Sequence, residues 1–117
     1  MKTLLFSLVY GCTILSAQLF INEIDYDQAG TDHDEFIEIA GPAGTYSNVT
    51  IELINGNNNS VYETVQISSL TLSNQSDGYG FHAEYISGIQ NGAPDGVQLS
   101  VGGVIVDAVA YEGSMND

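Results

Sequence analysis

Residues 97–111 read VQLSVGGVIVDAVAY. Two short runs rich in valine stand on either side of Gly102 and Gly103, and the first run alternates apolar with polar residues. A glycine pair readily adopts the positive φ of a two-residue hairpin loop, whose twist matches that of the flanking strands. The stretch therefore predicts an antiparallel β-hairpin with strands over 96–101 and 104–111.

The rest of the chain repeats this pattern, with short runs of Val, Ile, Thr, Tyr and Phe separated by turn residues. No segment keeps apolar residues at the spacing of an amphipathic helix. The further predicted strands cover 19–26, 35–40, 50–54, 61–67 and 80–86. Seven short strands without intervening helices predict an all-β fold, and we expect an antiparallel β-sandwich formed by one domain.

The N-terminus has the layout of a secretory signal peptide over residues 1–17. Lys2 is followed by an apolar run over 4–15, and Ala17 stands just before the composition changes. The apolar run is shorter than the ~20 residues of a membrane-spanning helix, so we expect no membrane span. Cys12 after Gly11 leaves a lipid anchor as an alternative. The expected product is a secreted or cell-surface domain over 18–117.

The charge of this domain is one-sided. Removal of residues 1–17 takes away Lys2 and Cys12, which leaves no lysine, arginine or cysteine beside the fifteen Asp and Glu residues of the chain. No disulfide can then stabilise the domain. Binding to a phosphate backbone is driven mainly by Lys and Arg, so no direct nucleic-acid binding is expected, and anionic membrane surfaces are disfavoured for the same reason.

Seven carboxylates crowd into residues 23–38. Calcium binds six to eight oxygen ligands and uses flexible carboxylate-rich loops, which makes it the natural counterion here. The candidate calcium ligands are Asp25, Asp27, Asp32, Asp34 and Glu35. The stretch is not an EF-hand, because Phe36 stands where that loop requires a glutamate. The alternative is a solvated acidic loop without a bound metal.

Two histidines raise the question of zinc. His33 lies among the acidic residues and His82 in a different predicted strand, whereas zinc usually takes three or four ligands. Structural or solvent-exposed histidines are the alternative. Among so many carboxylates a pair at the spacing of a glycosidase arises by chance, and there is no G-x-S-x-G nucleophile motif. We therefore expect no enzymatic activity.

The tyrosines offer a further possible site, a carbohydrate- or protein-binding surface. Tyr46 and Tyr79 are flanked by turn residues, and we expect them to be the most exposed. The alternative is that the tyrosines simply pack within strands, where this residue type is favoured.

Five blocks in order carry a family resemblance: NEIDYD, DHDEFIEI, ELINGNNNSVYETVQIS, IQNGAPDGVQL and VIVDAVAYEG. Together they resemble the lamin tail domain as it occurs in secreted bacterial proteins, over about residues 19–113. The resemblance implies an immunoglobulin-like sandwich that serves in binding, attachment or targeting. It implies no catalytic activity for the domain itself.

The expected function is thus a secreted, non-catalytic binding or attachment module, with an extracellular protein or polysaccharide as its partner. Members of the family usually continue past the position of Tyr111 through a further loop and strand, and are often joined to secreted enzymes. The alternative is therefore the N-terminal accessory module of a truncated secreted nuclease or other hydrolase, in a domain that lacks its last strand.

Overall fold

The computed structural model describes residues 18–27, 30, 33–92 and 94–113, so the predicted signal peptide lies outside the described residues. Seven β-strands form the described part of the chain. Their bounds are β1 Phe20–Asp25, β2 Phe36–Pro42, β3 Gly44–Asn55, β4 Ser60–Leu72, β5 Tyr79–Tyr85, β6 Asp95–Val101 and β7 Val104–Tyr111.

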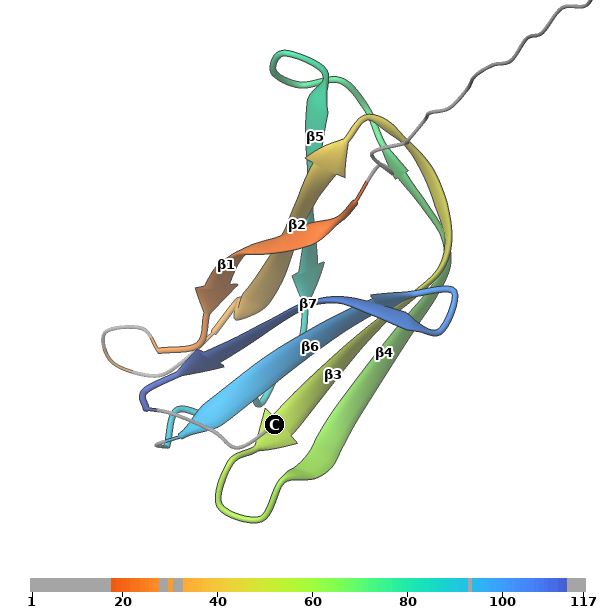
Figure 1. The fold of residues 1–117 in the computed structure, drawn as a ribbon. Coiled ribbons are helices and arrows are strands. Elements are labelled where there is room, and N and C mark those ends of the chain that lie inside the picture. The colour runs from red at the N-terminus through yellow and green to blue at the C-terminus, as the bar shows by residue number, and fades with distance from the viewer. Residues whose placement is uncertain (1–17, 28–29, 31–32, 93, 114–117) are drawn as a thin grey trace, which may run out of the picture.

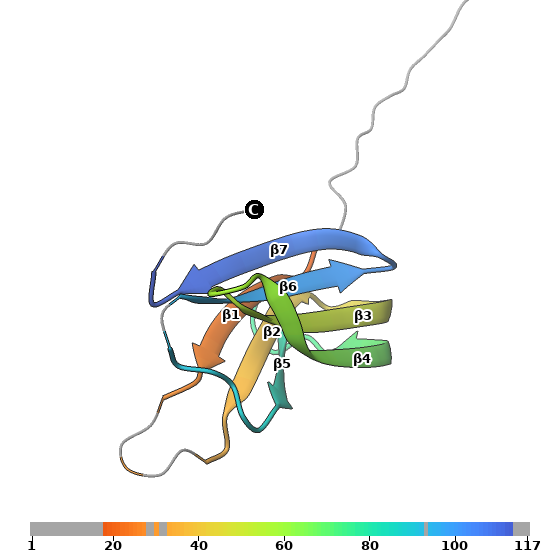
Figure 2. The ribbon, with the colours of Figure 1, turned by 90° about the horizontal axis from the view of Figure 1, so that it is seen from below.

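The strands form two antiparallel sheets that pack face to face (Figures 1 and 2). The smaller sheet has the order β1-β2-β5, and the larger sheet has the order β4-β3-β6-β7. The prediction of an all-β antiparallel sandwich with seven strands is confirmed, and the arrangement is immunoglobulin-like. All seven predicted segments are strands, and the β6–β7 hairpin runs as its sequence indicates.

The hydrophobic core lies between the two sheets. Ile37 and Ile39 of β2 face Ile51 and Leu53 of β3, and all four side chains are fully buried. The alternation of residues along each strand places these branched side chains on one face and leaves their neighbours on the other. The buried cluster is completed by Leu19, Val49, Leu70, Leu72, Ile86, Ile89, Val97 and Leu99.

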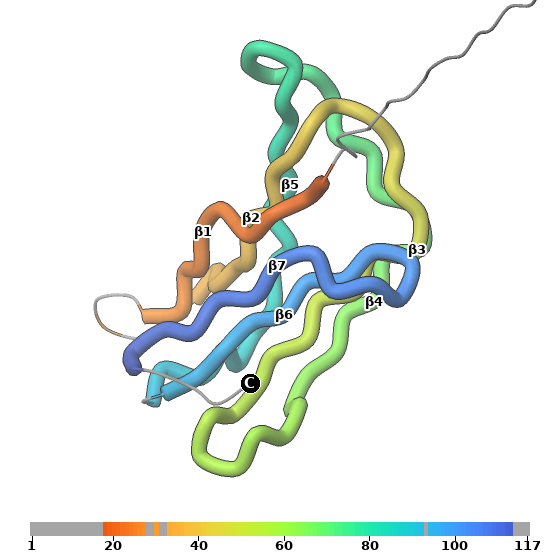
Figure 3. The backbone as a smooth tube through the Cα atoms, in the orientation of Figure 1, coloured from red at the N-terminus to blue at the C-terminus, as the bar shows by residue number. Residues whose placement is uncertain are grey.

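Two strands, β3 and β4, are longer than predicted by several residues. β3 begins at Gly44 rather than at residue 50, and β4 ends at Leu72 rather than at residue 67. The added segments pair with each other, from Gly44 with Leu72 to Ser47 with Ser69, and form an arm that curves toward the end of β2 (Figure 3). The sequence did not predict this pairing because the paired segments are mostly polar. Their only buried apolar residues are Leu70 and Leu72.

A close approach at Gly80 ties this arm to β5. A Cβ atom on Gly80 would lie 2.3 Å from the Ser73 carbonyl oxygen and 2.8 Å from the Leu72 Cβ atom. Only glycine allows the backbones to approach so closely. The contact fixes which face of β5 turns inward.

The turns follow the expected chemistry with one difference. Gly102 and Gly103 have φ of 59° and 84°, as a primed hairpin loop requires. In the β3–β4 hairpin Asn55 and Gly56 are residue types that readily adopt positive φ, but the positive φ lies at Asn59 (57°). Gly56 instead passes close to Pro94, whose carbonyl accepts a 3.0 Å hydrogen bond from the Gly56 N–H.

The lateral edges of the sheets are partly protected. β1 lies beside β7, where the Ile21 N–H donates to Asp107 Oδ2 (2.8 Å). On the opposite side, the Phe81 N–H of β5 donates to Gln75 Oε1 (2.7 Å). Such side-chain bonds occupy edge groups that otherwise pair with other chains. Across the described ranges no helix is long and apolar enough to cross a membrane.

Candidate functional site

The aromatic residues of β5 face solvent instead of the core. Tyr79, Phe81 and Tyr85 alternate with Gly80, His82 and Glu84, and only the second set shares a face with the buried Ile37 and Ile39. Tyr85 is 66% exposed and Tyr79 is 44% exposed. A large apolar set turned outward on a rigid strand is the reverse of the usual pattern.

Neighbouring strands extend this set across the smaller sheet. Cross-strand partners share a face, so Tyr85 lies beside Phe36, and Phe81 and Phe20 lie on either side of Ala40. We call the outer side of the β1-β2-β5 sheet the aromatic face. Its aromatic members are Phe20, Phe36, Tyr79, Phe81 and Tyr85.

Contacts between rings arrange the side chains of the aromatic face in pairs. The Phe36 and Tyr85 rings meet edge to face with centroids 5.7 Å apart, and the Phe20 and Tyr79 rings are 6.5 Å apart. Ala40 is fully buried although it points away from the core. Its place between Phe20 and Phe81 accounts for this, because the two larger side chains cover it.

Carboxylates separate the two aromatic rows. Glu23 of β1 stands directly opposite Glu38 of β2, between the Phe36 row and the Phe20 row. A β-bulge at Asn22 brings its amide to the same place, where Nδ2 donates to Glu38 Oε1 over 2.7 Å. Like charges directly opposite each other in a sheet are destabilising. The aromatic face therefore holds a pair of negative charges at its centre, and Asp25, which pairs with Phe36, adds a third carboxylate on the same side.

The predicted calcium ligands are only partly brought together. Asp25 ends β1, and Asp27 is exposed in the loop that follows. Asp34 is exposed, with its Oδ2 atom 3.3 Å from His33 Nδ1, while Asp32 lies outside the described residues. Within the described ranges, no group of three or more His, Cys, Asp or Glu side chains is placed to hold a metal ion. The calcium site stays a prediction.

Glu35 has a structural role that explains its burial. Only 7% of this residue is exposed, and its Oε1 atom accepts hydrogen bonds from the Gly88 N–H (2.9 Å) and the Ile89 N–H (3.3 Å). Its backbone carbonyl accepts a third from the Ile86 N–H (3.0 Å). The carboxylate thereby fastens the turn after β5, and a metal would have to compete with these amides.

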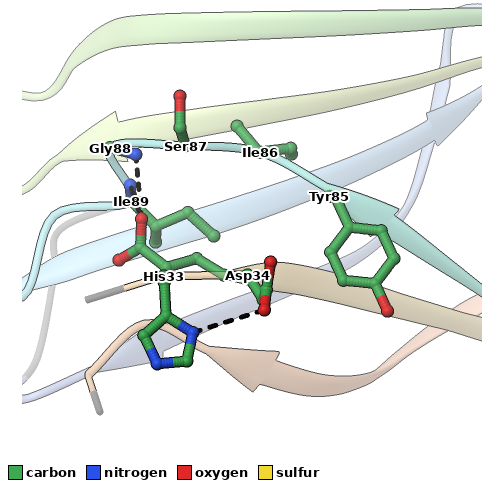
Figure 4. A pocket seen from close by; sticks show the side chains of 8 residues that line it. His33, Asp34, Tyr85, Ile86, Ser87, Gly88 and Ile89 are labelled. Atoms are coloured by element: carbon green, nitrogen blue, oxygen red, sulfur yellow. Dashed lines mark hydrogen bonds and ion pairs between the residues drawn. The ribbon is translucent and has the colours of Figure 1, made fainter. Parts of the chain in front are cut away.

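An open pocket of about 670 Å³ lies beside this turn. Its lining includes His33, Asp34, Ser87 and Tyr85, which are residue types found in hydrolytic sites. Figure 4 shows that Ser87 points to the opposite side of the turn from His33 and Asp34. The pocket therefore does not place a hydroxyl against an imidazole, as nucleophilic catalysis requires. The other histidine, His82, bonds Glu84 through Nε2 at 2.8 Å.

Two half-buried tyrosines, Tyr62 and Tyr111, hold the far end of the loop that follows β5. Tyr111 donates to the Gln90 carbonyl (2.7 Å), and the Gln90 N–H donates to the Tyr62 hydroxyl (2.9 Å). Burial raises the pKa of both phenols, so they stay protonated over the neutral range. Asp95 beside them is 3% exposed, and its Oδ1 atom accepts a long bond from the Gly56 N–H (3.4 Å). These residues anchor the loop, and of them Asp95 is buried.

Of the two tyrosines that the sequence predicts to be most exposed, one is exposed and the other is not. Tyr79 is exposed as predicted, whereas Tyr46 is half-buried and donates its hydroxyl to the Pro42 carbonyl (2.6 Å). The prediction for Tyr46 is wrong because that residue belongs to the unforeseen arm of β3. The sequence did not single out Phe81 and Tyr85, because aromatic residues that alternate along a strand normally belong to the core face. Gly80, which precedes Phe81 in the same strand, was the available signal, since a glycine inside a strand often marks a close backbone approach.

Comparisons with protein-family models, with curated proteins and with solved structures give no match for this chain.

Proposed function

We propose that this protein is a secreted, non-catalytic binding or attachment module that resembles a lamin tail domain, and that it binds an extracellular partner through the aromatic face. The observation that carries the proposal is the outward orientation of Phe81 and Tyr85 on β5. Exposed aromatic side chains gathered on one surface are typical of interaction sites.

The distribution of exposed apolar side chains supports this choice. Seven large hydrophobic residues are exposed in the described part of the chain, and four of them, Phe20, Tyr79, Phe81 and Tyr85, lie on the aromatic face. The others are divided between the two hairpin ends of the larger sheet, at Val61 and at Val104 with Ile105. A sheet also holds its side chains more rigidly than a loop, which favours recognition.

The lining of the pocket supports a binding role over catalysis. Glu35 is committed to two backbone amides, and Ser87 points away from His33. A general base must reach the proton that it removes, and a nucleophile needs a base beside it. We therefore propose that the protein acts by binding alone.

Retention on immobilised ligands tests the proposal. The panel contains insoluble neutral polysaccharide, an acidic protein and a basic protein. We expect the purified protein to be retained by one of them. The double variant Phe81→Thr/Tyr85→Thr should weaken that retention by at least about fivefold, because each lost aromatic contact contributes about 0.5–1.5 kcal/mol. Threonine keeps a high strand propensity, so the fold is maintained.

Val104→Thr/Ile105→Thr is the matched control, because it removes the same number of exposed apolar side chains from the β6–β7 hairpin. This variant should be retained like the unmodified protein. Equal losses in both double variants, or no retention on any member of the panel, would contradict a binding role for the aromatic face.

A further inference from the structure

We infer that the partner bound at the aromatic face is a protein segment that presents arginine or lysine side chains. The inference rests on the proposed function and adds the chemistry of the partner. It follows from the charge of the face, from the order of its rows and from the repulsion at its centre.

The negative charge of the molecule favours a cationic partner. The formal net charge is −14, and the single cation of the chain, Lys2, precedes the described residues. Glu23 and Glu38 place negative charge at the middle of the aromatic face. A polyanion would be repelled there, and a second copy of this chain would bring its own Glu23 and Glu38 against the same pair. A cationic partner avoids both of these repulsions.

The rows of the face suit cationic side chains. Each row lies two residues further along β2, which corresponds to ~7 Å between rows. Phe36 and Tyr85, with Asp25 paired to Phe36 on the β1 side, form one row. Glu23 and Glu38 form the next, and Phe20 and Phe81 form the third. An extended peptide repeats its side chains on one face at the same distance. A guanidinium over the central row can bond a carboxylate while its neighbours stack on the rings.

Neutralisation of the central pair distinguishes this partner from a sugar. Glu38 is held toward Glu23 by strand register and by the 2.7 Å bond from Asn22. Binding of a cation would relieve the repulsion between these carboxylates. A neutral polysaccharide would stack on the rings but would leave the repulsion in place.

Fluorescence anisotropy with the full chain tests the inference. The probes are three labelled peptides with serine at every second position and arginine, lysine or uncharged citrulline at the others. We expect the arginine peptide to bind most tightly, since guanidinium groups stack on aromatic rings better than ammonium groups do. The citrulline peptide should bind at least about tenfold more weakly, and added salt should weaken arginine binding.

Charge-matched variants separate the face from the overall charge. Glu23→Gln/Glu38→Gln should weaken arginine-peptide binding by at least about fivefold. Glu52→Gln/Glu63→Gln changes the net charge equally on the larger sheet and should alter it by less than about twofold. Thermal melts establish that both variants are folded. Equal losses in both pairs, or citrulline binding as tight as arginine binding, would overturn the inference.

A neutral oligosaccharide is the remaining arm of the experiment. If it binds, and Phe81→Thr/Tyr85→Thr abolishes that binding while the arginine peptide does not bind, the aromatic face is a binding site and the cationic partner is refuted. If Phe81→Thr/Tyr85→Thr leaves arginine binding unchanged, the peptide binds elsewhere and this inference fails.

Discussion

Gly80 decides at the level of a single residue which side of β5 faces the core. Its Cα lies so close to the backbone of Ser73 that a methyl group would overlap it. We expect Gly80→Ala to lower the free energy of unfolding by about 1–3 kcal/mol, the usual cost of overpacking. Gly92→Ala is the control, because nothing lies within 4 Å of its position. Denaturant unfolding measures both, and equal stabilities would argue against the close approach.

Glu35 carries a second prediction at this scale. Glu35→Ala removes the acceptor of two backbone amides, one buried at Ile89 and one partly buried at Gly88. It should cost about 1–3 kcal/mol, the usual penalty for a buried donor left unpaired. Glu35→Gln keeps the Oε1 acceptor and should cost less than half as much. Hydrogen exchange at Gly88 and Ile89 should accelerate in the alanine variant alone. Similar exchange rates in both variants would show that this carboxylate does not hold the turn.

At the residue scale, the sequence predicts correctly which side chains are buried where strand alternation determines it. It fails where tertiary contacts determine which face of a strand turns inward. Strand alternation puts Glu35, Ile37 and Ile39 on one face of the 35–40 segment, and the structure buries all three residues. The same rule applied to β5 would bury Phe81, because hydrophobicity alone does not register the tight passage of Gly80 past Ser73. The aromatic face could therefore not be predicted from composition.

At the scale of elements, β4, β7 and the loop that follows β5 are joined by Tyr62 and Tyr111. Desolvation raises the pKa of both phenols above the ordinary value of 10.0. Below pH 10 these tyrosines are protonated in both states and do not make stability depend on pH. As pH rises through about 10, the unfolded chain loses the protons that the folded chain retains, so unfolding is favoured.

We therefore expect the melting temperature to fall steeply above about pH 10, and expect this fall to be shallower in Tyr62→Phe/Tyr111→Phe. The double variant should also lose about 1–3 kcal/mol at neutral pH, because the half-buried N–H and C=O of Gln90 lose their partners. Melts from pH 7 to 11 measure both effects. An alkaline profile identical to that of the unmodified protein would refute this role.

Element existence was easier to predict than element length. Gly102 and Gly103 define the β6–β7 hairpin by local backbone chemistry, which a sequence displays directly. The arm of β3 and β4 depends on pairing between Gly44–Ser47 and Ser69–Leu72, segments whose polar residues carry no strand signal of their own.

For the whole molecule, uncompensated charge is the dominant constraint. With a net charge of −14, the folded state concentrates repulsion that salt screens. We expect the melting temperature to rise with sodium chloride and also on mild acidification. A melting temperature indifferent to both would refute the idea of strained charge. The predicted calcium site requires a further rise in melting temperature that is selective for calcium over magnesium at matched ionic strength. Its predicted ligands include Asp25, Asp27, Asp32 and Asp34.

The most direct test of the central claim is to titrate the isotope-labelled protein with the arginine peptide and to map the amide chemical shifts by NMR. If the aromatic face is the binding site, the largest changes fall on β1, β2 and β5, centred on Glu38 and Phe81, while β3 and β4 stay unperturbed. Changes centred on the acidic loop around Asp27 and Asp34, or spread evenly over both sheets, would contradict the account.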